Sequence, residues 1–154
     1  MNTELGDLEE LYQEVILDHS RHPRRFGKLE RATNTAQGYN PLCGDRVTIY
    51  LIVGQDDRIA DIKFEGRGCA ISQASASLMS DMIVGRTVAE AEKLMGGFLN
   101  LVKGEEVRGL NDEDREKLDV MAGVSAFPMR VKCATLAWHT MKSALEGGGS
   151  AKTE

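Results

Sequence analysis

Three cysteines, far apart in the chain, fall where predicted secondary-structure elements meet, and their placement constrains the fold more than any other feature. Cys43 lies in a Pro-Leu-Cys-Gly turn, Cys69 lies between a predicted strand and a predicted helix, and Cys133 lies in the first turn of the last predicted helix. Because elements end at such junctions, backbones converge there and the three thiols can point at a common centre.

Two of these positions favour a deprotonated thiol. Cys69 is expected at or just before a helix N-terminus, where backbone N–H groups and the helix dipole stabilise a thiolate. Cys133 has the cations Arg130 and Lys132 close by in the sequence, and they act in the same direction. Since the thiolate is the form that attacks electrophiles and binds metals, both cysteines are candidates for chemistry.

A carboxylate lies two residues after the first cysteine. Asp45 follows Cys43 where the chain enters a predicted strand, and residues two apart on an extended segment project to one side. Three thiolates and one carboxylate are a credible tetrahedral set for Zn²⁺. The predicted metal ligands are Cys43, Asp45, Cys69 and Cys133.

The spacing of the cysteines leaves a simpler interpretation open. Free cysteines are commonly buried as small apolar side chains, and three of them need not meet. The chain has no Cys-x-x-Cys pair, and a Cys-x-Asp sequence alone is a weak signal for a metal. From spacing alone, a metal site and three buried thiols both remain possible.

Hydrophobic periodicity predicts an α+β fold, in which a small three-stranded antiparallel sheet packs against several helices. β-Branched residues dominate one strand, an alternating segment returns after a turn, and a weaker strand precedes both. The predicted strands cover 33–39, 46–53 and 58–65. The predicted helices cover 5–22, 70–84, 88–102, 112–120 and 129–145.

Length and composition bound the class of protein. A chain of 154 residues with 42% hydrophobic residues suits one domain, predicted over 1–146, followed by a flexible Gly-rich tail over 147–154. A net charge of −5 argues against nucleic acid or an anionic membrane as the main partner. The sequence shows no signal peptide, and three widely spaced cysteines make no disulfide framework, so we expect a cytoplasmic protein.

The segments around the cysteines resemble the signature segments of the IscU/NifU N-terminal family of iron–sulfur cluster assembly proteins. They are Asn40-Pro-Leu-Cys-Gly-Asp45, Gly66-Arg-Gly-Cys-Ala-Ile-Ser72 and Arg130-Val-Lys-Cys-Ala-Thr-Leu-Ala-Trp138. The opening helix, followed by Pro23, also resembles the first helix of that family. The resemblance covers nearly the whole chain, with the order and type of the elements agreeing.

Within the family, the chain looks like the SufU branch. The scaffold branch has a histidine immediately before the third cysteine, where this chain has Lys132. It also has a Leu-Pro-Pro-Val-Lys chaperone motif upstream, which residues 124–129 do not match. Residues 104–120 resemble an additional stretch found in SufU proteins.

The resemblance implies a function. Zn²⁺ would be bound by Cys43, Asp45, Cys69 and Cys133, and a PLP-dependent cysteine desulfurase would be the partner, alongside other cluster-assembly proteins. Cys43 would accept persulfide sulfur, as in a zinc-dependent sulfurtransferase, and Arg130 and Lys132 would contact the partner. Two alternatives stay open: a scaffold that assembles a transient [2Fe–2S] or [4Fe–4S] cluster on the same cysteines, and a structural zinc site without transfer chemistry.

Overall fold

Three consecutive segments with alternating burial form an antiparallel sheet. The computed structural model describes residues 3–147 and 149–152. Along the central strand every second side chain faces the helices, which is the period that a half-buried strand requires. The strands are β1 (Asn34–Asn40), β2 (Asp45–Val53) and β3 (Ile59–Arg67). The predicted antiparallel sheet is confirmed, with boundaries shifted by one or two residues.

A fourth strand extends this sheet. β4 (Gly149–Lys152) pairs in parallel with β1, with Ala36 opposite Gly149, so the strand order is β3-β2-β1-β4. The Gly-rich composition predicted flexible chain over 147–154, and the four residues of β4 are a strand instead. An edge strand presents unpaired backbone N–H and C=O groups, and β4 pairs with those of β1. Residues 148, 153 and 154 of the expected tail lie outside the described residues.

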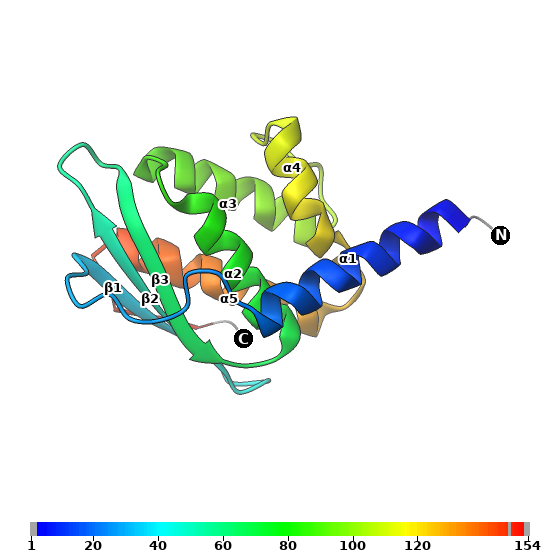
Figure 1. Cartoon of the computed structure of the whole chain (residues 1–154), viewed down its shortest axis with the longest axis horizontal. Helices are drawn as coiled ribbons and strands as arrows, with labels where there is room; N and C mark the ends of the chain where they lie inside the picture. The colour runs from blue at the N-terminus through cyan, green and yellow to red at the C-terminus, as the bar shows by residue number, and fades with distance from the viewer. Residues whose placement is uncertain (1–2, 148, 153–154) are drawn as a thin grey trace.

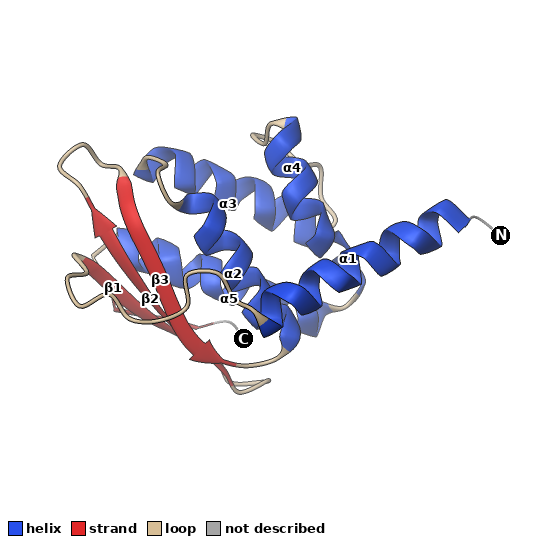
Figure 2. Ribbon diagram, viewed as in Figure 1, coloured by secondary structure: helices blue, strands red, loops and turns tan. Residues whose placement is uncertain are grey.

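The helices cover one face of the sheet, as Figures 1 and 2 show. α2 packs against β3, and α5 packs against β1 and β2. The helices are α1 (Thr3–Arg21), α2 (Ala70–Ile83), α3 (Val88–Val102), α4 (Asp112–Leu118) and α5 (Pro128–Leu145), with a 3₁₀ segment η1 (Asp119–Ala126) before α5. Each predicted helix is present within about two residues of its expected bounds, an ordinary uncertainty for helix ends.

Local capping signals explain where these helices begin. Thr87 and Glu90 form the predicted capping box of α3, with reciprocal side-chain to backbone hydrogen bonds of 3.1 and 3.0 Å. Asn111 caps α4 by accepting from the backbone N–H of Asp114 at 2.7 Å. Pro128 occupies the start of α5, where its missing N–H costs no helical hydrogen bond.

The core between sheet and helices holds α5 in position. Trp138 of α5 is fully buried, stacks on Phe98 of α3 at 4.5 Å between ring centroids, and donates its indole N–H to Ser75 of α2 at 3.1 Å. The Ser75 hydroxyl in turn donates to the backbone carbonyl of Ala134, the residue after Cys133. The depth and rotation of α5 at Cys133 are therefore set by packing against two other helices.

α1 joins the core through its C-terminal end, and its N-terminal part extends away from the rest of the molecule (Figure 1). His19 is buried and its Nδ1 lies 2.8 Å from the Ser77 hydroxyl of α2, which also accepts from the backbone N–H of Arg24. His19 thus contributes to the packing of α1 on α2. It is far from the cysteines in the sequence, and its hydrogen bond is to Ser77. Within the described residues, no helix is long and apolar enough to cross a membrane.

Candidate metal centre

The turn between β1 and β2 presents the first cysteine. Asn40 and Asp45 form the last pair of the hairpin register, and the four residues between them make the turn. The turn is closed by two hydrogen bonds to Asn40, from the backbone N–H of Leu42 at 3.2 Å and from that of Gly44 at 2.8 Å. Gly44 has a φ of +72°, a backbone conformation that glycine adopts at little cost. Cys43 is consequently held at an exposed tip.

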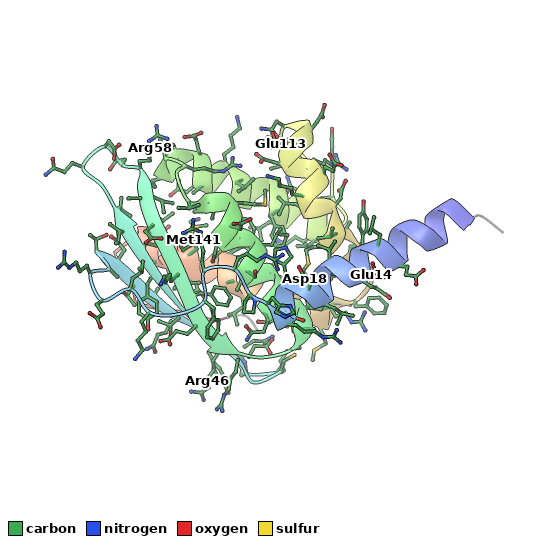
Figure 3. The ribbon with its side chains drawn as sticks, viewed as in Figure 1. Glu14, Asp18, Arg46, Arg58, Glu113 and Met141 are labelled. Atoms are coloured by element: carbon green, nitrogen blue, oxygen red, sulfur yellow. The ribbon has the colours of Figure 1, made fainter. Side chains whose placement is uncertain are left out.

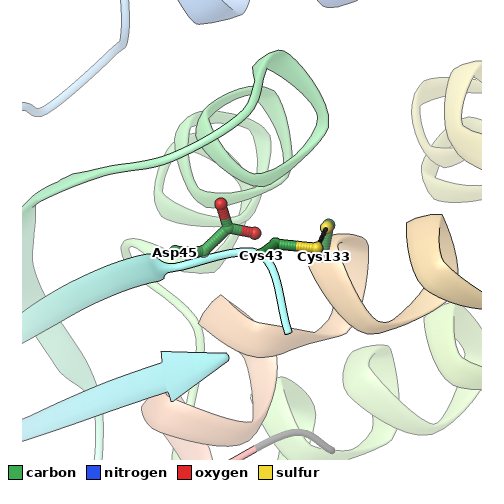
Figure 4. Close-up of side chains that lie close together, drawn as sticks. All are labelled: Cys43, Asp45 and Cys133. Atoms are coloured by element: carbon green, nitrogen blue, oxygen red, sulfur yellow. Dashed lines mark hydrogen bonds between the residues drawn. The ribbon is translucent and has the colours of Figure 1, made fainter. Parts of the chain in front are cut away.

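The third cysteine meets the first. Cys133 is buried, and its thiol donates to the sulfur of Cys43 across 3.5 Å, drawn as a dashed line in Figure 4. Cys133 was expected in the first turn of the last helix, but α5 begins at Pro128, which makes Cys133 its sixth residue. The helix dipole acts mainly within the first turn, so it contributes less at Cys133 than expected.

Asp45 links the first and second cysteines. Its carboxylate is buried at the start of β2 and accepts the backbone N–H of Cys69 at 3.0 Å and the Cys69 thiol at 3.8 Å. The chain can approach this closely because residue 68 is glycine: a Cβ there would lie 2.4 Å from an oxygen of Asp45. Gly66 is needed for a similar reason, since its Cβ would lie 2.1 Å from the backbone oxygen of Arg46.

Cys69 is the N-cap of α2, as predicted. Its side chain accepts a hydrogen bond from the backbone N–H of Ser72 at 3.4 Å. A sulfur in this position faces the positive end of the helix dipole, which favours negative charge on it. The thiol is exposed, so an incoming group has access to it.

Three of the four predicted ligands lie within reach of one ion. One donor atom from each of Cys43, Asp45 and Cys133 lies within 4.8 Å of the other two. Two sulfur ligands of a tetrahedral zinc ion with bonds of about 2.3 Å would lie about 3.8 Å apart, close to the 3.5 Å between Cys43 and Cys133. Cys69 is not within that set and touches its edge through Asp45. The donor types and spacing fit a metal ion, with Cys69 next to them.

Burial dominates the electrostatics of Cys133. Desolvation raises the pKa of its thiol, and hydrogen bonds with Asp45 and Cys43 and the nearby Cys69 act in the same direction. Arg130 and Lys132 were expected to favour the thiolate, but the pKa of the buried thiol is raised instead. A cation bound among these side chains would reverse the preference, because a coordinating thiol is deprotonated outright.

Exposed apolar side chains occur on both segments that carry the paired sulfurs, the β1–β2 turn and the start of α5. Leu42, next to Cys43, is 55% exposed, and Phe127 and Met129 at the start of α5 are each 48% exposed. Large apolar side chains that stay exposed together are typical of interaction surfaces. We call these three residues the apolar rim.

Cations accompany the apolar rim. The guanidinium of Arg130 lies 4.4 Å from the ring centroid of Phe127, which holds its charge at the surface. Arg46, labelled in Figure 3, follows Asp45 at the start of β2, and its guanidinium lies 4.9 Å from the centroid of the Tyr39 ring. Lys132, the other predicted contact, is half-buried one residue before Cys133. The segments that carry the site therefore present exposed apolar side chains and cations, on a chain of net charge −5.

Asn40 is a site residue that was not predicted from the sequence. It is fully buried, and its amide Nδ2 donates to the sulfur of Cys133 at 3.8 Å. An asparagine at the end of a strand and before a proline reads as an ordinary turn residue. Its contact with Cys133 depends on the packing of α5, which no local pattern encodes.

The fold and the site define a class: a small α+β protein that gathers cysteines and an aspartate from three separate segments at one end of its sheet. Residues 11–147 match the family described as the NifU-like N terminal domain. The chain belongs to this family, which confirms the family expected from the three cysteine segments.

Individual relatives support the same placement and carry two kinds of name. A zinc-dependent sulfurtransferase SufU of Bacillus subtilis is 38% identical over 94% of this chain and 97% of its own. An iron–sulfur cluster assembly scaffold protein IscU of Thermotoga maritima is 43% identical over 88% of this chain and 93% of its own.

A solved structure confirms the predicted fold. The protein in the crystal structure of SufU of the SUF system from Fervidobacterium islandicum is 40% identical to this chain. The two structures superpose over 86% of this chain and 94% of the Fervidobacterium chain, with a TM-score of 0.79.

Proposed function

We propose that this protein takes part in iron–sulfur cluster assembly as a zinc-bound sulfur acceptor, which receives persulfide sulfur from a PLP-dependent cysteine desulfurase. One observation carries the proposal: the exposed Cys43 lies 3.5 Å from the buried Cys133, beside the buried carboxylate of Asp45. An accessible sulfur next to a buried sulfur and a buried carboxylate suits a group that must react at the surface and stay deprotonated.

Zinc is the proposed resident metal, held by Cys43, Asp45, Cys69 and Cys133. The short contacts within this set support a single ion, and the Bacillus subtilis relative is named as zinc-dependent. Bound zinc would keep the coordinating thiols deprotonated at neutral pH. Cys69 would need only a small movement toward Cys43 and Cys133, since its thiol already touches Asp45.

Cys43 is the proposed acceptor because its thiol is exposed at the tip of a turn and belongs to the set with Asp45 and Cys133, whereas Cys69, the other exposed thiol, lies outside that set. Its thiolate attacks the terminal sulfur of the persulfide carried by the desulfurase cysteine. A new S–S bond forms on Cys43 while the S–S bond of the donor breaks, and the donor cysteine leaves as a thiolate. The outer sulfur keeps its proton, so no oxidant or reductant is consumed. Buried Cys133 cannot take this role without opening the structure.

The apolar rim and its cations are the proposed docking surface for the desulfurase. Leu42, Phe127 and Met129 provide apolar area on the segments that carry Cys43 and Cys133, while Arg130 and Lys132 provide positive charge. A partner with an acidic and apolar surface around its persulfide would be complementary. We place the activity in the cytoplasm, where reducing conditions would keep the three free cysteines reduced.

A scaffold role is the second candidate. The Thermotoga maritima relative is named as a scaffold, at an identity similar to that of the zinc-dependent one. The same three cysteines would then hold an iron–sulfur cluster as cargo, with Asp45 beside it. Both roles use one site, so metal content separates them.

Metal analysis is the experiment that tests the proposal. The protein would be purified anaerobically, and zinc, iron and acid-labile sulfide would be measured per chain for the wild type and for Cys43→Ser, Cys69→Ser and Cys133→Ser. About one zinc per chain with negligible iron, together with stimulation of a desulfurase, is the expected result. Iron with matching sulfide would favour the scaffold role. The absence of both zinc and iron would overturn the metal centre itself.

A further inference from the structure

Asn40 contacts the site at two points through one side chain. Its Nδ2 donates to the sulfur of Cys133 at 3.8 Å, and its Oδ1 accepts from the backbone N–H of Leu42 at 3.2 Å, within the turn that carries Cys43. The residue is 0% exposed, so neither end of the amide is satisfied by bulk water. One planar group thus joins a residue of α5 to the turn of the β1–β2 hairpin.

The orientation of this amide follows from its partners. The backbone N–H of Leu42 can only donate, so the oxygen of Asn40 must face it. The NH₂ group is then directed at Cys133, whose sulfur is the acceptor. Turning the amide over would place NH₂ against N–H and an oxygen lone pair against the sulfur, losing both hydrogen bonds.

Hydrogen bonding changes what a sulfur does. A donated N–H stabilises electron density on sulfur and therefore lowers its tendency to attack an electrophile. Cys133 receives this bond and is 3% exposed, while Cys43 is exposed at the tip of the turn. The two sulfurs lie side by side with different surroundings, and Asn40 is a buried polar group that makes part of this difference.

We propose that Asn40 is a positioning residue that makes Cys133 the anchored sulfur and leaves Cys43 as the reactive one. Its amide N–H restrains the Cys133 sulfur, and its oxygen holds the turn that presents Cys43. This inference deepens the proposed function, because it names what directs an incoming electrophile to one of two adjacent sulfurs. It concerns the chain's own thiols, so its test needs no desulfurase.

Three variants separate the two hydrogen bonds. Asn40→Asp has nearly the same shape and keeps an oxygen for Leu42, but its carboxylate has no N–H for the sulfur. Asn40→Ala loses both bonds. Asn34→Ala is the matched control, since Asn34 lies on the same strand and its amide also donates to α5, but to the backbone oxygen of Ala144 at 2.8 Å.

The readout is the rate at which iodoacetamide modifies each cysteine of the zinc-loaded protein, followed by peptide mass spectrometry. We expect Asn40→Asp and Asn40→Ala to raise the rate at Cys133 about tenfold relative to Cys69, the loss of one hydrogen bond to a charged group. Asn34→Ala should leave the ratio unchanged. If Asn40→Asp behaves like the wild type at Cys133, the sulfur bond has no such role and the inference is overturned.

A second measurement covers the case in which Asn40→Asp does not fold, as judged by circular dichroism. Cobalt(II) would be loaded into the wild type, Asn40→Ala and Asn34→Ala, and the sulfur-to-metal charge-transfer absorption compared. Loss of an N–H bond to a coordinated sulfur should move this band to lower energy in Asn40→Ala alone. Identical bands in all three proteins would overturn the inference, whatever the sulfur-transfer assays show.

Discussion

The sulfur atoms of Cys43 and Cys133 lie 3.5 Å apart, although 90 residues separate them in the chain. One sits on an exposed hairpin turn and the other in a buried helix that crosses behind the sheet. This pairing of an accessible sulfur with a buried one underlies the proposed chemistry, and the predictions below test the elements that maintain it.

Replacing Cys43 with serine should abolish sulfur uptake while leaving the fold intact. The side chain is exposed, so its loss removes little packing. A serine hydroxyl stays protonated at neutral pH and is a weak nucleophile, so it cannot replace the thiolate. Uptake would be measured as mass added to the protein after incubation with a desulfurase and cysteine. Full uptake by Cys43→Ser would assign the acceptor role to another cysteine.

Gly68→Ala should disturb the centre through Asp45. The added Cβ would lie 2.4 Å from the carboxylate oxygen, which would have to move. We expect a loss of about 1–3 kcal/mol in the free energy of unfolding, typical of overpacking, and a reduced zinc content.

Gly96→Ala is the matched control for that change. Gly96 lies inside α3, and a Cβ there would meet no atom within 4 Å. This variant should gain about 0.5–1 kcal/mol, since alanine favours a helix over glycine. Urea denaturation and metal analysis would check both proteins, and equal behaviour of the two would contradict the steric role of Gly68.

The ion pair between Arg86 and Asp114 should be important for stability. Two hydrogen bonds of 2.7 and 3.0 Å join the groups, and the side chain of Asp114 is 8% exposed. Arg86→Met would leave a buried carboxylate without its cation, at a cost of about 3 kcal/mol. The exposed pair of Arg108 and Glu106 is the comparison, where Arg108→Met should change stability by no more than about 0.5 kcal/mol. Similar urea midpoints for the two variants would refute this expectation.

His19 should make the protein less stable in mild acid. Burial lowers the pKa of His19 from its ordinary value of 6.5, with the charge of Arg24 acting in the same direction. The unfolded chain therefore binds a proton at this histidine more readily than the folded protein does. The contribution of neutral His19 to the free energy of unfolding is full above pH 6.5 and is lost as the pH falls through 6.5 toward the folded-state pKa.

The variant His19→Asn, whose amide can still reach Ser77, should lose less stability than the wild type on acidification. The measurement is the urea midpoint of both proteins at about pH 7.5 and pH 5.5, on either side of the ordinary histidine pKa. Burial also lowers the pKa of His139, so some pH dependence should persist in the variant. Equal losses in the two proteins would show that His19 contributes nothing to the pH dependence.

Much of the fold was predictable because its signals are local. The alternation in β2 and the capping box of Thr87 and Glu90 each depend on residues a few positions apart, and both are present as expected. β4 was missed because Gly149–Lys152 has no strand signal of its own and pairs only where β1 offers an open edge. Cys133 was placed in the first turn of α5, but it is the sixth residue of that helix, which begins one residue before its predicted start.

By itself, the sequence determined which groups could do chemistry here and that each would lie at a junction: Cys43 on a turn, Cys69 at a helix N-cap, and Asp45 at a strand start. Local conformational preferences are enough for that. Only the tertiary structure decided that Cys133 meets Cys43 while Cys69 touches the set through Asp45, and that Asn40 donates to a sulfur. Those relationships depend on how α5 is held across the sheet by Trp138, and close packing between distant segments leaves no periodic trace in the sequence.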